Sequence, residues 1–303
     1  MTLCVAAACI EDDAPRVVIG TDWRVEGALA AGAEIQEKLY WINDDIFVLI
    51  AGKVTRAIEL RDVYRDILRR MEKNNDPLTK FNIRRWIRQA PKLYHKHRVD
   101  DEVGGMMGGL TFQEFLGSVS RKEIPDTIAG PVFRRVERTE IGCSLIVVAY
   151  VDGAFYIFRV DPDGDVDECD NFAAIGEGIG IADGWLYFRA SNSDDDATLQ
   201  IYQVWEAMTI ASQCVSTVGK NLTVNLIYPP GVKGKHVCGD VVTSTGEKFL
   251  RGLYRDRFGP RKIAYVPSLP EKGLAPDFEE DEPIEAEDAS MSSDSQTSEG
   301  ETK

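Results

Sequence analysis

The chain has 303 residues, of which 44% are hydrophobic and 28% charged, and this is enough to bury one sizeable core. Its formal net charge of −15 argues against a nucleic-acid partner, because nucleic-acid-binding proteins normally present a basic face to the phosphates. No apolar run approaches the roughly 18 residues of a membrane-spanning helix, so we expect no membrane partner.

The cysteines show no paired spacing typical of a metal site. Several lie in apolar stretches, which predicts reduced and mostly buried thiols in a cytoplasmic protein. We therefore expect neither a metal nor another cofactor. The six cysteines are Cys4, Cys9, Cys143, Cys169, Cys214 and Cys238.

Residues 2–51 predict two β-hairpins, one after the other. Apolar strands at 2–10 and 16–20 flank a turn at 11–15 that contains three acidic residues and a proline. Strands at 35–42 and 46–51 flank the turn Asn43-Asp44-Asp45, and Gly52 ends the last run.

Helices are predicted next. Residues 55–73 carry apolar side chains at three- and four-residue spacing, which is typical of an amphipathic helix. Residues 78–98 continue helically, with a break expected at Pro91, and the glycines at 104–109 predict a loop. The later elements are predicted as strands at 144–151, 154–160 and 171–175, a helix from about 195 to 214, and strands at 222–228 and 236–242.

The order of these elements indicates the fold class. Helices come in blocks and do not alternate with single strands, which argues against a doubly wound parallel sheet. We therefore predict an α+β fold, a four-layer αββα sandwich of two antiparallel sheets flanked by helices, over residues 1–266. Residues 267–303 are rich in Pro, Glu, Asp and Ser, which predicts a disordered acidic tail.

The start of the chain carries a pattern of chemically distinctive residues: Thr2, Asp22, Lys38 and the pair Ala51-Gly52. Asp22 and Lys38 are 16 positions apart, and Lys38 and Gly52 are 14 apart. This pattern resembles the proteasome β-type subunits and HslV, bacterial proteasome-like proteins of the N-terminal-nucleophile hydrolase family, in which both separations are the same. The stretch from Thr2 to Asp22 is longer here than in that family. The additional residues fall in the turn at 11–15, where a hairpin accommodates them at little cost in free energy.

The resemblance implies a catalytic set made of Thr2, Asp22, Lys38 and Gly52. Removal of Met1 would expose the α-amine of Thr2, which has an ordinary pKa of about 8 and would act as base for the Thr2 hydroxyl. Lys38 would lower the pKa of that amine, and Asp22 would hold Lys38 in place. The backbone N–H of Gly52 would stabilise the oxyanion.

The resemblance also implies a set of residues around the substrate side chain, namely Val25, Gln36, Tyr40, Ile50 and Val54. Downstream the chain departs from the family. Residues 176–179 read Gly-Glu-Gly-Ile where the family usually has Gly-Ser-Gly-Ser, and residues 215–219 lack the family's Asp. Arg24, Glu177 and Ser216 are the candidates for a supporting role near the Thr2 amine.

The activity that the resemblance implies is that of a threonine-type endopeptidase. It would work as a ring of copies of itself on a peptide or unfolded protein substrate, with an ATP-driven unfoldase as a candidate partner. Two alternatives stay open. The missing downstream Asp motivates a catalytically inactive structural subunit, and the same nucleophile could serve an amidase that acts on a small amide.

Overall fold

A computed structural model describes residues 3–22, 24–25, 33–34, 38–230, 248 and 250, with backbone alone for 24–25 and 33–34. Its strands form two main sheets, both antiparallel. The first has the order β10-β1-β2-β11 and contains β1 (Leu3–Glu11), β2 (Ala14–Asp22), β10 (Phe172–Gly176) and β11 (Leu222–Ile227). The second runs β5 (Leu39–Asn43), β6 (Ile46–Gly52), β7 (Cys143–Val151), β8 (Ala154–Val160) and β9 (Val166–Cys169). A short separate pair joins β3 (Arg24–Val25) to β4 (Ala33–Glu34).

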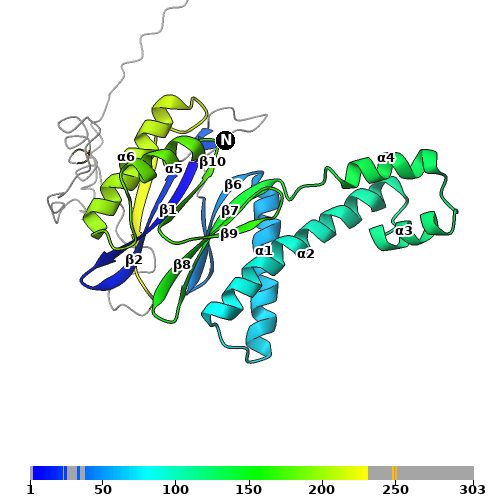
Figure 1. Ribbon diagram of the computed structural model, residues 1–303, viewed down its shortest axis with the longest axis horizontal. Coiled ribbons are helices and arrows are strands. Elements are labelled where there is room, and N and C mark those ends of the chain that lie inside the picture. The colour runs from blue at the N-terminus through cyan, green and yellow to red at the C-terminus, as the bar shows by residue number, and fades with distance from the viewer. Residues whose placement is uncertain are drawn as a thin grey trace, which may run out of the picture.

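Helices cover the outer faces of both sheets. Figure 1 shows α5 (Ile179–Phe188) and α6 (Ala197–Cys214) outside the four-stranded sheet, and α1 (Val54–Lys73) and the first part of α2 (Lys80–Met106) outside the five-stranded sheet. The core is divided in the same way, with one apolar cluster under each helical layer and a third between the sheets. The predicted four-layer αββα sandwich of the α+β class is therefore confirmed.

The alternation of side chains along the strands explains these layers, because successive residues of a strand point to opposite faces. Along β1, Leu3 and Val5 pack under α5 and α6, whereas Cys4 and Ala6 lie between the sheets. Along β6, Ile46, Val48 and Ile50 pack under α1 and α2, and the residues between them fill the inter-sheet core. Strands buried on both faces read as nearly continuous apolar runs, as these do.

The break expected at Pro91 is wrong, since α2 runs without interruption from Lys80 to Met106. A proline removes the N–H that would bond to the carbonyl four residues earlier, here that of Ile87. The hydroxyl of Tyr64, on α1, donates to this carbonyl at 3.1 Å, in a buried position. A tertiary hydrogen bond thus replaces the one that Pro91 deletes. The loop predicted at 104–109 is also partly wrong, because Gly104 and Gly105 belong to the helix.

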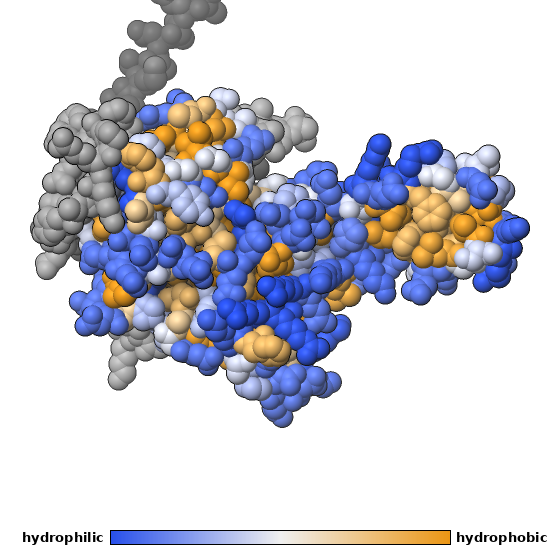
Figure 2. All heavy atoms as spheres, viewed as in Figure 1, coloured by the Kyte–Doolittle hydropathy of each residue, from blue (hydrophilic) through white to orange (hydrophobic). Residues whose placement is uncertain are grey.

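A helical arm extends from the sandwich, built from the second half of α2 together with α3 (Phe112–Ser120) and α4 (Asp126–Val136) (Figure 1). It has a small core of its own, made of Val99, Val103, Phe115, Ala129 and Val132. Figure 2 shows apolar side chains gathered over the outer part of this arm. The sequence predicts neither α3 nor α4, because each is short and leaves few buried residues to mark a period.

Four further elements escape prediction, namely β3, β4, β9 and α5. The predicted strand 236–242 and the predicted tail 267–303 lie outside the described residues. The helix predicted at 78–98 ends eight residues before α2 does, and the other predicted strands and helices agree with the structure to within a few residues at their ends where they are described. None of the described helices is both long and apolar enough to pass through a lipid bilayer.

Candidate active site

Asp22 ends β2 at the point where three segments of the chain meet, and its side chain is fully buried. One carboxylate oxygen, Oδ1, accepts from the backbone N–H of Leu3 at 3.0 Å and pairs with the ammonium of Lys38. The other, Oδ2, accepts from the backbone N–H of Gly219 at 2.7 Å. Asp22 therefore binds together the start of β1, the residue before β5 and the loop after α6.

Lys38 is buried as well, with 6% of its side chain exposed. Its position is fixed through the backbone, since its carbonyl accepts from the N–H of Ile50 at 3.1 Å across the β5–β6 pair. A buried ammonium is costly unless a carboxylate compensates it, and here Asp22 does so. The structure thus brings together two of the residues that the sequence singles out.

Gly52 is the last residue of β6, and its backbone has a φ of +92°, a conformation that favours glycine. A side chain there would also crowd β7, because an added Cβ would lie 3.2 Å from the Cα of Cys143. Backbone N–H groups alternate between the two edges of a strand. Since the Ile50 N–H points to Lys38, the Gly52 N–H, two residues further on, points to the same edge.

We predict that Gly52→Ala loses stability and, if the site is catalytic, activity. Forcing an alanine to a positive φ costs about 1–2 kcal/mol, and a displaced oxyanion donor costs about 10²–10³ in kcat. Gly153, in the β7–β8 turn, is the matched control, since its φ is +83° and an added Cβ meets no atom within 4 Å. Gly153→Ala bears the cost of the positive φ alone, so it should lower the melting temperature somewhat less and leave kcat unchanged. Equal kcat losses in the two variants would show that Gly52 has only a structural role.

Three of the residues predicted to surround the substrate are described, two in the five-stranded sheet, Tyr40 and Ile50, and one, Val54, at the start of α1. Tyr40 and Val54 are half-buried and pack against the apolar cluster under α1 and α2, to which Ile50 belongs. The ring of Tyr40 lies 5.4 Å from the guanidinium of Arg61. Ile50 is 3% exposed and could meet a ligand only as the floor of a pocket. Ile50 and Val54 flank Gly52 in the chain, as a substrate-binding role would require.

A second polar contact joins the turn after β10 to the loop after α6, next to the start of β1. Leu3 pairs with Gly176 in the β1–β10 register, which places Glu177 beside the start of β1. The hydroxyl of Thr217 donates to the carboxylate of Glu177, and so connects this turn to the loop after α6. Ser216, the other candidate for a supporting role, is exposed in the same loop.

The cysteines near this region are structural. The thiol of Cys4 donates to the carbonyl of Ile50 at 3.5 Å and so connects the two sheets. Burial raises the pKa of the Cys143 thiol, opposite Gly52, to about 12, which keeps it protonated and unreactive. Neither residue is a competing nucleophile for this site.

Several predicted residues lie outside the described part of the chain. They are Thr2 and Gln36, and the side chains of Arg24 and Val25. Their roles stay predictions. The sequence does not single out the N–H groups of Leu3 and Gly219 or the hydroxyl of Thr217. Backbone donors carry no side-chain signal, and a lone Thr in a loop has no pattern that would single it out.

Comparison with protein families points the same way. The Proteasome family, described as proteasome subunit, matches residues 131–225, about a third of the chain. This segment contains Glu177, Thr217 and Gly219 but none of the N-terminal residues that carry the resemblance in the sequence. The resemblance to proteasome-like N-terminal-nucleophile hydrolases is thus confirmed from an independent part of the chain. No curated protein matches the sequence.

Proposed function

We propose that this chain is a threonine-type peptidase subunit whose nucleophile is Thr2, exposed after Met1 is removed. The observation that carries the proposal is the buried Asp22 carboxylate. It pairs with Lys38 and accepts from the N–H of Leu3, the residue next to Thr2. A buried charge pair needs a reason to exist, because apolar residues of similar volume are usually at least as stable. Holding an ammonium beside the chain's N-terminal amine is such a reason.

The alternation of β1 supports the placement of Thr2. Cys4 and Ala6 point between the sheets, so continuing the same alternation back along the strand predicts a Thr2 side chain on that side. Cys4 already contacts the backbone of β6 from there, at Ile50, two residues before Gly52. The Thr2 hydroxyl would then face the strand end that carries the Gly52 amide.

The chemistry follows from these placements. The free α-amine of Thr2 takes the proton of its own hydroxyl while Oγ bonds to the carbonyl carbon of the scissile amide. The electrons of the C=O bond move to oxygen, where the Gly52 N–H donates to the developing oxyanion. The C–N bond then breaks, and the departing amine takes the proton from the Thr2 ammonium. Water, deprotonated by the same amine, adds to the resulting ester, and the C–Oγ bond breaks as Oγ takes the proton back from the ammonium, which releases the acid and restores the Thr2 hydroxyl. Lys38 disfavours the protonated amine throughout.

Met1 should be absent from the mature protein, because threonine is small enough for methionine aminopeptidase to act on the bond before it. Intact mass spectrometry of protein purified from its native cells tests this. Thr2→Ala permits the same processing and should abolish hydrolysis of a fluorogenic peptide, whereas Thr2→Ser keeps a hydroxyl and should retain part of it. Quantitative retention of Met1 in the native protein would contradict the nucleophile assignment.

Assembly is the second element of the proposal. Family resemblance supports a ring built from this chain, in which confinement would supply the selectivity that a simple nucleophile lacks. The substrate would be a peptide or an unfolded protein, and an ATP-driven unfoldase would deliver the latter. Native mass spectrometry would separate a ring from a monomer, and a monomer with full activity would favour an amidase with a small substrate.

An inactive structural subunit is the other candidate, and two observations favour it. Residues 215–219 lack an Asp, and Glu177, which could orient the Thr2 amine, is already engaged by Thr217. In that case the Asp22–Lys38 pair would serve folding alone. Wild-type protein without activity, indistinguishable from Thr2→Ala and Lys38→Ala, would establish this alternative.

A further inference from the structure

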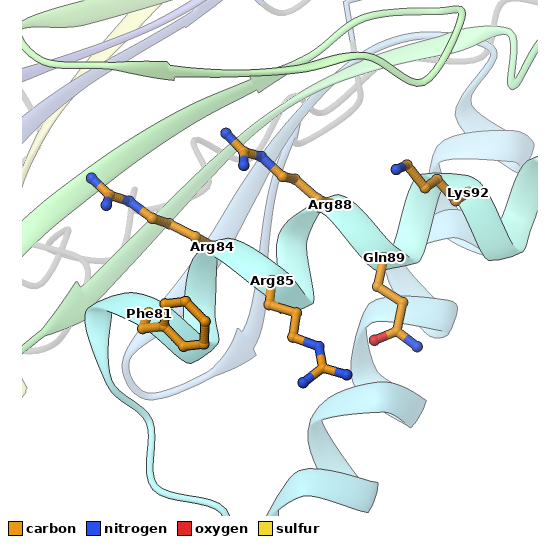
Figure 3. Close-up of a pocket in the computed structure, with 6 residues that line it drawn as sticks. All are labelled: Phe81, Arg84, Arg85, Arg88, Gln89 and Lys92. Carbon is orange, nitrogen blue, oxygen red and sulfur yellow. The ribbon is translucent and has the colours of Figure 1, made fainter.

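The exposed side of α2 carries a concentration of positive charge. Phe81, Arg84, Arg85, Arg88, Gln89 and Lys92 line an open hollow of about 530 Å³ (Figure 3). Lys96, also exposed, follows Lys92 by four residues and so lies one turn further along. We call Arg84, Arg85, Arg88, Lys92 and Lys96 the basic face of α2.

Most of this charge has no partner in the described chain. Arg84 pairs with Glu168 of β9 at 2.6 Å, and Asp76 lines an adjoining hollow together with Arg85. Over the described residues, however, no ion pair involves Arg85, Arg88, Lys92 or Lys96. Like charges three and four residues apart on a helix repel one another and destabilise it. An anionic ligand bound there would reduce this repulsion.

The same chain contains a segment of matching chemistry. Residues 277–288 read Asp-Phe-Glu-Glu-Asp-Glu-Pro-Ile-Glu-Ala-Glu-Asp, with eight acidic side chains in 12 positions. From Arg85 to Lys96 a helix rises by about 16 Å, which five or six residues of extended chain also span. Phe278 in the segment and Phe81 on α2, which is 75% exposed, offer an apolar contact at one end.

The connecting chain is long enough. Leu250 is buried in the apolar cluster to which α5 and α6 contribute, and it fixes one end of the connection. The residues from there to Asp277 could span up to about 90 Å when extended. The sandwich has four layers at a spacing of about 10 Å, so the path around it is of the order of the reach available. The tether makes the docking intramolecular, so its extent should not depend on protein concentration.

We propose that residues 277–288 dock on the basic face of α2 within the same chain. The acidic segment supplies the counter-charges that the helix lacks, and the tether makes the docking intramolecular. This inference is independent of the proposed peptidase activity.

Zero-length cross-linking of the full chain tests the proposal, because a water-soluble carbodiimide joins only amines and carboxylates that are in contact. At about 0.05 M salt we expect peptides that join Lys92 or Lys96 to residues 277–288, found by mass spectrometry. Raising the salt to about 0.5 M should lower their yield, since screening shortens the range of exposed charges. Lys73, exposed at the end of α1, should give few such products.

Charge reversal gives the matched comparison. Arg85→Glu with Arg88→Glu should lower the cross-link yield at Lys92 by about ten-fold, because attractions are replaced by repulsions. Arg134→Glu with Arg138→Glu, exposed on the arm, makes the same change in net charge and should leave the yield unchanged. Replacing Glu279 and Glu280 by arginine should restore it in the first variant.

Three results would overturn the proposal. The first is an absence of products between the basic face and residues 277–288 at low salt, and the second is a yield indifferent to reversal of Arg85 and Arg88. The third is a set of products that join isotopically light and heavy chains after mixing. It would show that the segment docks on a second copy.

Discussion

Replacing Lys38 by alanine should lower kcat/KM for hydrolysis of a fluorogenic peptide by about 10²–10⁴, the usual loss when general base catalysis is impaired. The reason lies in the charge that Lys38 holds near the start of β1, where it would keep part of the Thr2 amine unprotonated at neutral pH. Stability should fall much less, by about 1–3 kcal/mol. Asp22 still accepts from the N–H groups of Leu3 and Gly219, so the carboxylate does not lose all of its partners.

Denaturant unfolding and steady-state kinetics on the same preparations separate these two effects. Lys38→Met, which keeps most of the side-chain volume without the charge, should match Lys38→Ala in activity and exceed it in stability. If Lys38→Ala keeps near-normal hydrolysis while Thr2→Ala abolishes it, Thr2 is the nucleophile but Lys38 does not activate it.

Removing the carboxylate of Asp22 should have the largest effect on folding. Asp22→Ala leaves Lys38 buried without its counter-charge and two backbone N–H groups without an acceptor. Breaking a buried pair from one side typically costs about 3–5 kcal/mol, which is a large part of the stability of an ordinary domain. We expect a correspondingly lower midpoint in urea. Asp22→Asn combined with Lys38→Met should recover part of the stability, because no buried charge remains, and none of the activity.

The pair Arg189–Glu206 is the matched control, since both side chains are almost completely buried between α5 and α6. Glu206 accepts from Arg189, Trp185 and Tyr202, so Glu206→Gln should destabilise the fold strongly. The kcat of the Glu206→Gln variant, per folded molecule, should nevertheless stay at the wild-type value. If Asp22→Asn with Lys38→Met behaves in the same way, the Asp22–Lys38 pair is structural and has no part in catalysis.

The layers of this fold can be predicted from the sequence because they depend on local patterns. The runs around Val18 and Val48 are continuous and apolar, as strands buried on both faces must be, and the period of α1 is that of a helix packed on one side. The helix through Pro91 could not be predicted, since the hydroxyl that replaces its missing hydrogen bond comes from Tyr64, 27 positions earlier in the chain. The arm cannot be predicted from the sequence, because its small core depends on contacts between three helices, each of which contributes few buried residues.

The candidate site was predictable to the extent that its chemistry lies in side chains. Asp22 and Lys38 stand out by type and spacing, and the structure brings them together. The Gly219 amide could not be found in this way, because every residue except proline carries the same donor and only the fold decides which one reaches a buried carboxylate. The same holds for the contact between Thr217 and Glu177, which depends on how two distant loops meet.

The most direct test of the peptidase assignment is covalent labelling of the native protein with an epoxyketone or boronate directed at N-terminal threonine. Mass spectrometry of the N-terminal peptide should find the adduct on Thr2, with Met1 absent. Labelling should slow in Lys38→Ala and should be lost in Thr2→Ala. A native protein that has lost Met1 and folds normally, yet gives no adduct at Thr2 under conditions that label a known threonine peptidase, would contradict the assignment.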